Sequence, residues 1–104
     1  MWKDEEVSAI YGREVARQQR VLRMIPSENI MSEGVRAALG GVFCNKYAEG
    51  HPSKRYYQGQ ENNDALERLA QARACALFGA EHANVQSYSG SPANMAAYMA
   101  VCEP

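Results

Sequence analysis

The first twenty residues carry hydrophobic positions at helical spacing. Ile10 and Tyr11 lie three and four residues after Val7, and Val15 lies four residues after Tyr11. Charged side chains fill most of the positions between them, so the apolar side chains would share one face of an α-helix. The pattern predicts an amphipathic helix from Asp4 to about Arg20.

A turn and a second, shorter helical pattern come next. Pro26 disfavours helical backbone at the residue before it, and Ser, Glu and Asn at 27–29 are turn formers that also suit a helix cap. We expect a loop near Pro26 to Asn29. A short helix should then begin near Ser32 and end at the Gly-Gly pair 40–41.

The residues from 61 onward predict a helix, a short strand and a final helix, in that order. The first has an apolar face: Leu66, Leu69, Ala70, Ala74 and Leu77. Residues 62–64 are its cap candidates, and Gly79 is its expected stop. A strand in "ANVQSYS" should end in a Ser-Gly-Ser turn, followed by a helix with Ser91 as N-cap and Pro92 as its first residue. Because strand signals are so few, an α/β fold would need further residues to complete its sheet.

Composition and charge narrow the classes of function. The chain has 104 residues, 46% of them hydrophobic and 22% charged, which is typical of a soluble globular domain that needs a core. A formal charge of -1 offers no electrostatic footprint for nucleic acid or an anionic membrane. There is no bilayer-length apolar run and no signal peptide, so the default expectation is cytoplasmic.

Cysteine and histidine give no sign of a metal site. The three cysteines are widely spaced without a C-x-x-C pair, and we expect them to be reduced and structural. Neither His51 nor His82 has a partner at ligand spacing. The sequence therefore predicts no metal.

The stretch "NKYAEGHPSKRYYQGQE" (45–61) holds most of the candidate chemistry and reads as neither helix nor strand. Tyr47 and Glu49 would point to the same side of an extended segment, which sets a phenol beside a possible general acid or base. The alternative is a polar surface loop whose tyrosines are half-buried against a neighbour. The density of functional groups favours a functional loop.

Cationic side chains add to this stretch. Lys54 and Arg55 place anion donors beside the phenols of Tyr56 and Tyr57. The sequence therefore offers an anion site next to the tyrosines.

Two serine-containing turns are also candidates for ligand binding. Ser89, Gly90 and Ser91 would expose unpaired N–H groups and two hydroxyls at a helix N-terminus, which suits a phosphate. The simpler interpretation is that Ser91 only caps its own helix. Ser27, steered by Pro26, has a hydroxyl that could bind a ligand carboxylate, although a plain turn or cap also explains it.

Three motifs, taken together, indicate a resemblance to a known family. "NKYAEG", "KRYY" and "ANVQ-x-x-SGSPAN" occur in an order and spacing that resemble the N-terminal part of serine hydroxymethyltransferases, over residues 22–104. The resemblance implies a fold-type-I, aspartate-aminotransferase-like α/β enzyme that uses pyridoxal 5'-phosphate. Such an enzyme converts serine and tetrahydrofolate to glycine and methylenetetrahydrofolate. It further implies a helical arm over 1–24 and an incomplete cofactor-binding large domain over 25–104.

The resemblance also implies roles for individual residues. Glu49 would be the acid or base for the serine hydroxyl, assisted by Tyr56. The tyrosine-rich segment would reach into the neighbouring subunit, so a homodimer is implied. Contacts with the cofactor or substrate would come from six residues: Ser27, Tyr47, Tyr57, Ser89, Gly90 and Ser91.

Some of the family's pattern is missing from these 104 residues. The Schiff-base lysine, the ring-stacking histidine, the aspartate for the pyridine nitrogen and the arginine for the substrate carboxylate lie further along in the family. Lys3, Lys46 and Lys54 stand in the wrong places to replace that lysine. We therefore expect the chain alone to be inactive and marginally folded. Two alternatives are a fragment of another fold-type-I enzyme, such as a threonine aldolase-like one, and a non-catalytic helical interaction protein.

Overall fold

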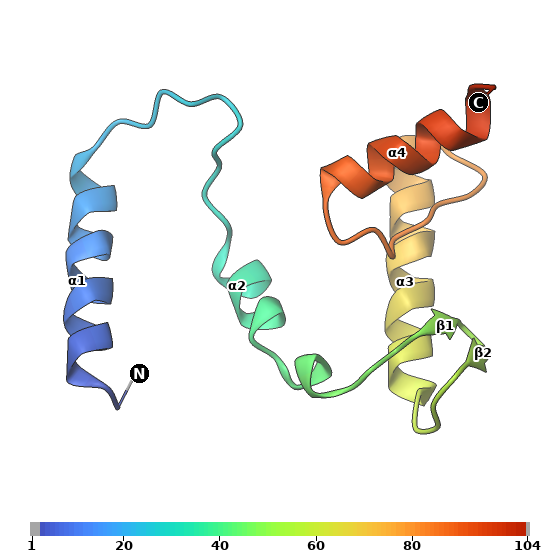
Figure 1. Cartoon of the computed structure of the whole chain (residues 1–104), viewed down its shortest axis with the longest axis horizontal. Helices are drawn as coiled ribbons and strands as arrows, with labels where there is room; N and C mark the ends of the chain where they lie inside the picture. Colours follow the sequence, from blue (N-terminus) through green and yellow to red (C-terminus); the bar gives the residue numbers. More distant parts are fainter. Residues whose placement is uncertain (1–2, 104) are drawn as a thin grey trace. The chain divides into compact units, whose positions relative to one another are not determined.

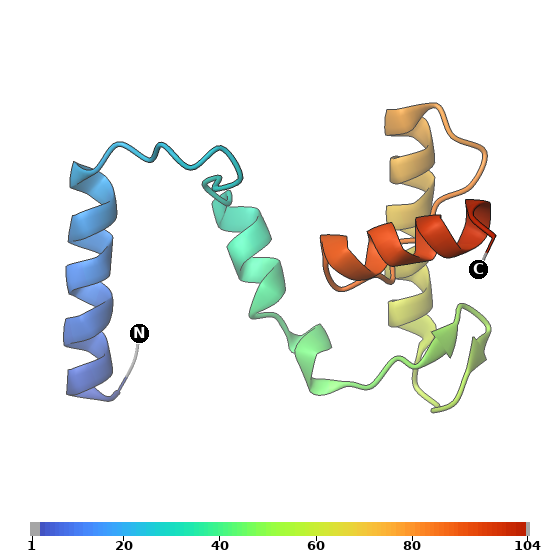
Figure 2. The same cartoon turned by 45° about the horizontal axis from the view of Figure 1, so that its top comes forward.

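The structure is a computed structural model that describes residues 3–103. The chain divides into two compact units, Met1–Leu39 and Gly40–Pro104 (Figure 1). The first unit holds helices α1 and α2. The second holds the 3-10 helix η1, a hairpin of strands β1 and β2, and helices α3 and α4. Figure 2 shows the same elements turned by 45°.

Helix α1 spans Glu5–Arg20 and confirms the first predicted helix. Asp4 is its N-cap, because the carboxylate oxygen accepts the N–H of Val7 at 3.1 Å. Acidic residues in the first turn and basic residues in the last turn match the helix dipole. Glu14 accepts hydrogen bonds from Arg17 and Gln18, which lower its pKa from 4.5 to about 2.

The rest of the first unit also follows the prediction. The Glu28 N–H donates to the Ile25 carbonyl oxygen at 3.1 Å and closes the expected turn around Pro26 and Ser27. Helix α2 spans Glu33–Leu39. Ser32 caps it by accepting the Val35 N–H at 3.3 Å. The loop and the short helix are therefore confirmed.

The second unit begins with η1 (Val42–Asn45) and the antiparallel strands β1 (Gly50–His51) and β2 (Lys54–Arg55). The expectation that residues 45–61 contain no strand is therefore wrong. A two-residue loop at 52–53 makes the hairpin possible. Proline fixes φ near -65° at position 52, and Ser53 has φ +66°, the combination of a type II turn. The Ser53 N–H donates to Asp64 Oδ2 at 2.7 Å, which holds this unusual backbone.

Helix α3 spans Glu61–Phe78, and Gly79 ends it as predicted, with φ 63° and its N–H on the Cys75 carbonyl oxygen. Its N-cap is Gln60, so the prediction of a cap at residues 62–64 is wrong. Those side chains are used otherwise: Asp64 binds the hairpin, and Asn63 Nδ2 donates to Gln60 Oε1 at 2.7 Å.

Helix α4 spans Gly90–Val101 and has Ser89, not Ser91, as its N-cap. Pro92 lies in the first turn, where N–H groups have no partner within the helix. Its missing donor therefore costs nothing, and the helix begins two residues earlier than predicted.

The predicted strand at 83–88 is also wrong. Within residues 3–103 the only sheet is the β1–β2 hairpin, and this segment pairs with neither strand. A strand requires a partner for its backbone groups, and no described segment supplies one. The second unit is consequently helical apart from one small hairpin.

Hydrophobic burial is slight throughout the part of the chain that the structure describes. None of these apolar side chains is buried, and the one buried polar residue is Gln60, at 6% exposure. The expected core is not formed, so polar contacts hold the hairpin to α3. No helix among residues 3–103 is long and apolar enough to cross a membrane.

Candidate active site

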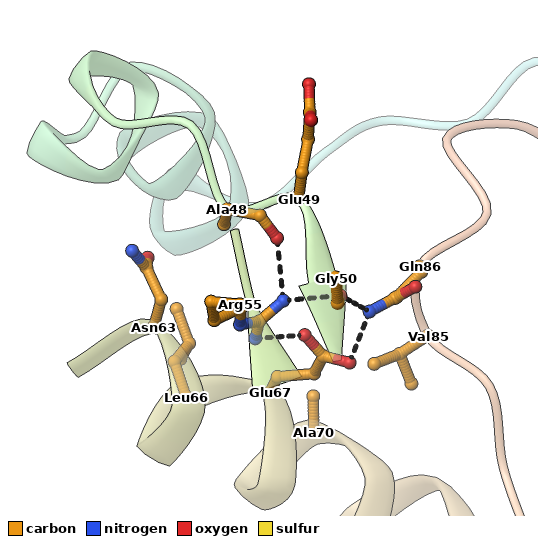
Figure 3. Close-up of a pocket in the computed structure, with 10 residues that line it drawn as sticks. All are labelled: Ala48, Glu49, Gly50, Arg55, Asn63, Leu66, Glu67, Ala70, Val85 and Gln86. Carbon is orange, nitrogen blue, oxygen red and sulfur yellow. Dashed lines mark hydrogen bonds and ion pairs between the residues drawn. The ribbon is translucent and has the colours of Figure 1, made fainter. Parts of the chain in front are cut away.

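The hairpin has one face toward α3 and one face away from it. Gly50 pairs with Arg55 in the hairpin. Next to this pair, Glu49 faces Tyr56, and the Tyr56 N–H donates to the Glu49 carbonyl oxygen at 3.2 Å. Because side chains alternate along a strand, Glu49 and Tyr56 belong to the face opposite Arg55. Figure 3 shows the Glu49 carboxylate directed away from the guanidinium. The structure thus brings together the two residues predicted to be catalytic.

Arg55 anchors the hairpin on its inner face. Its Nε donates to Asp64 Oδ1 at 2.8 Å, and its Nη2 donates to Glu67 Oε2 at 2.6 Å (Figure 3 shows the Glu67 contact). Its Nη1 donates to the carbonyl oxygens of Ala48 and Gly50 at 2.7 and 2.9 Å. The Arg55 side chain is 4% exposed and each carboxylate side chain 13%. The cluster fixes the backbone on both sides of Glu49.

The charges in this cluster stabilise one another. Hydrogen bonds to Asp64 and Glu67 raise the pKa of the Arg55 guanidinium. The hydrogen bond from Arg55, with that from the Ser53 N–H, lowers the pKa of Asp64. The prediction that Arg55 serves as an anion donor is therefore wrong, since four of its five N–H groups already have protein acceptors.

The polar face of α3 supplies Asp64 and Glu67, the two acidic partners of Arg55. The two carboxylates lie three residues apart on one face, together with Gln60 and Asn63. That spacing of polar residues was visible in the sequence. It could have indicated a helix face that binds a polar partner.

The tyrosines lie together beyond the hairpin. The rings of Tyr47 and Tyr57 have centroids 6.0 Å apart at 33°, and Lys46 Nζ lies 5.9 Å from the centre of the Tyr57 ring. The buried Gln60 donates through Nε2 to the Tyr47 carbonyl oxygen at 2.6 Å. Tyr47 and Tyr56 are 76% and 79% exposed. Their phenols are open to a ligand.

The N-terminus of α4 has the donors that a phosphate needs. Ser89 makes no capping hydrogen bond with its side chain, and Gly90 and Ser91 are the first helical residues. Their N–H groups have no acceptor within the helix and lie at the positive end of its dipole. A Cβ added to Gly90 would meet no atom within 4 Å, so the approach is open.

The remaining candidate, Ser27, belongs to the other unit. It lies in the turn that the Glu28 N–H and the Ile25 carbonyl oxygen close. The seven candidates in the second unit are Tyr47, Glu49, Tyr56, Tyr57, Ser89, Gly90 and Ser91.

An open pocket of about 530 Å³ lies between the hairpin, α3 and the segment that leads to α4 (Figure 3). Gln86, from that segment, donates through Nε2 to the Gly50 carbonyl oxygen and to Glu67 Oε1. The sequence analysis gave Gln86 no role, because no local pattern distinguishes it from an ordinary strand residue.

Comparison with known proteins identifies the family of the chain. The family described as serine hydroxymethyltransferase matches residues 1–104. The chain belongs to the serine hydroxymethyltransferase family. The family match extends the resemblance seen over 22–104 through the first helix.

Three of the curated relatives illustrate the similarity, and each is named serine hydroxymethyltransferase. The chain is 54% identical to the one from Methanospirillum hungatei, 58% to that from Leuconostoc citreum and 56% to that from Acidobacterium capsulatum, each over 101 residues. These alignments cover 97% of the chain and 24%, 25% and 24% of the relatives. The chain therefore spans about a quarter of the length of the curated relatives it matches.

Proposed function

We propose that this chain supplies the acid–base loop and part of the cofactor-phosphate site of a serine hydroxymethyltransferase. The complete enzyme would interconvert serine and tetrahydrofolate with glycine and 5,10-methylenetetrahydrofolate. The supporting observation is the hairpin. Arg55 fixes the backbone on both sides of Glu49, and the Glu49 carboxylate is directed away from the Arg55 cluster. The finer fold, a fold-type-I α/β domain beginning near residue 25 after a helical arm, is part of the same proposal.

The α4 N-terminus fits the phosphate of pyridoxal 5'-phosphate. The N–H groups of Gly90 and Ser91 and the hydroxyls of Ser89 and Ser91 would hold it, and the open approach at Gly90 leaves room for it. When bound, the cofactor serves as an electron sink for bonds broken at the amino acid's α-carbon. The lysine that binds it covalently in the family has no match among the three lysines here, so the isolated chain should be inactive.

Glu49 would hold or move the proton of the serine hydroxyl oxygen. Tyr56 lies beside it through the backbone hydrogen bond and would assist at the same atom. Tyr47 and Tyr57 would orient cofactor or substrate across a homodimer interface. Ser27 would lie near the cofactor and the amino-acid carboxylate.

A chimaera tests this function in a complete enzyme. The matching segment of the Leuconostoc citreum relative is replaced by this chain, and glycine formation from serine is measured with and without tetrahydrofolate. We expect folate-dependent glycine formation within about tenfold of the parent enzyme, because the two segments are 58% identical.

The outcomes separate the alternatives. Cleavage of β-hydroxy amino acids without any dependence on folate would support a threonine aldolase-like activity instead. A folded, cofactor-bound chimaera that catalyses neither reaction would favour a non-catalytic interaction protein and contradict the proposal.

A further inference from the structure

The side chain of Gln86 connects three parts of the second unit. Its Nε2 lies 2.9 Å from the Gly50 carbonyl oxygen and 2.8 Å from Glu67 Oε1 (Figure 3). Both partners are acceptors, so only the NH2 of the carboxamide can face them. The Gln86 N–H donates to Asn84 Oδ1 at 2.8 Å, which orders the backbone from which the side chain extends.

The carbonyl group of Gly50 is held from two directions. It accepts from Arg55 Nη1 on β2 and from Gln86 Nε2 on the segment before α4. Gly50 directly follows Glu49 and has φ 98°, a conformation that L residues rarely adopt. The peptide between Gly50 and His51, one residue beyond Glu49, is therefore fixed by one side chain within the hairpin and by one outside it.

We infer that Gln86 is a positioning residue. It holds Glu49 at a fixed position relative to the N-terminus of α4. The inference rests on the proposed function. Gln86 lies three residues before Ser89, the N-cap of α4, so one carboxamide joins the acid–base loop to the segment leading into the phosphate site. Its effect should fall on the proton transfer by Glu49 and leave affinity for the amino acid unchanged.

The surrounding contacts allow Gln86 to be replaced without loss of the hydrogen bonds that hold the hairpin to α3. Loss of Gln86 should leave in place the 2.6 Å hydrogen bond between Arg55 Nη2 and Glu67 and the bond between Arg55 Nε and Asp64. Gln71 offers a matched control, because its Nε2 lies 3.5 Å from the same Glu67 oxygen. Unlike Gln86, it has no hydrogen bond to Gly50 among those of residues 3–103.

The experiment compares Gln86→Met and Gln71→Met in the chimaera, since methionine has a similar length without donors. We expect Gln86→Met to lower kcat about 10- to 100-fold, with KM for serine and bound pyridoxal phosphate within about twofold. For Gln71→Met, the kcat, the KM for serine and the amount of bound pyridoxal phosphate should each stay within about twofold of the unchanged chimaera. Amide hydrogen exchange at Tyr56, measured without cofactor, should become faster in Gln86→Met only.

A double-mutant cycle with Glu49→Gln distinguishes positioning from general damage. Gln86→Met should change kcat by less than about twofold once the carboxylate is gone, because nothing remains to be positioned. An equal loss in both backgrounds, an unchanged kcat or a loss of bound cofactor would overturn the inference. If Glu49→Gln alone leaves kcat unchanged, the proposed function fails, and the inference fails with it.

Discussion

Replacing Gly50 by alanine should disturb the candidate acid–base loop more than the same change at Gly59, Gly79 or Gly90. A Cβ at this position would lie 2.3 Å from the Lys54 carbonyl oxygen and 3.1 Å from the Arg55 Cα, both backbone atoms. The first distance is roughly 1 Å inside ordinary contact. The two strands must separate by about that amount. In addition, φ 98° costs an alanine about 1–3 kcal/mol.

The displacement reaches Glu49 directly, because Glu49 precedes Gly50 and its carbonyl oxygen pairs with the Tyr56 N–H. A shift of about 1 Å in a catalytic group lowers the rate about 100-fold. We therefore expect kcat of the Gly50→Ala chimaera to fall by about that factor while cofactor is still bound. The assay is folate-dependent glycine formation, with pyridoxal phosphate content as the check on folding.

Gly79→Ala is the matched control. Gly79 also has positive φ, 63°, but an added Cβ would meet no atom within 4 Å. It should cost about 1 kcal/mol of stability at the end of α3 and leave kcat unchanged. If Gly50→Ala has the kcat of Gly79→Ala, the hairpin does not position Glu49, and the reasoning is refuted.

Three further predictions concern the contacts of the isolated chain. Asp4→Ala should destabilise α1 by about 1 kcal/mol and speed amide exchange at Val7, whereas Asp4→Asn keeps the cap; equal exchange in both would contradict this. Because the folded pKa of Glu14 is lowered to about 2, its hydrogen bonds stabilise α1 fully above about pH 4.5 and are lost as the pH falls toward 2; circular dichroism should show this loss reduced in Glu14→Gln. Arg55→Lys retains the charge but not the four hydrogen bonds, so amide exchange across the hairpin should become faster; unchanged exchange would show that charge alone suffices.

Local signals predicted the helices well. Gly79 ends α3 as the sequence indicated, because a left-handed glycine is decided by a few neighbouring atoms. The same holds for the turn at Pro26 and Ser27. The start of α4 was misplaced by two residues because a proline is tolerated anywhere in a first turn.

Contacts distant in sequence could not be predicted in this way. The Arg55 cluster joins residues 9 and 12 positions apart, and Gln86 reaches Gly50 across 36 positions. No periodic pattern encodes such pairs. Arg55 was consequently assigned to an anion, and the strand at 83–88 was predicted although its segment finds no partner in residues 3–103.

The most direct test of the central claim is kcat of the chimaera with Glu49→Gln, set against Glu61→Gln as control. Both changes remove one carboxylate, and Glu61 lies at the start of α3. We predict that Glu49→Gln lowers folate-dependent glycine formation about 10²- to 10⁴-fold, the usual contribution of a general acid or base, and that Glu61→Gln does not. Equal rates in the two variants would contradict the assignment of this chain as the source of the enzyme's acid–base residue.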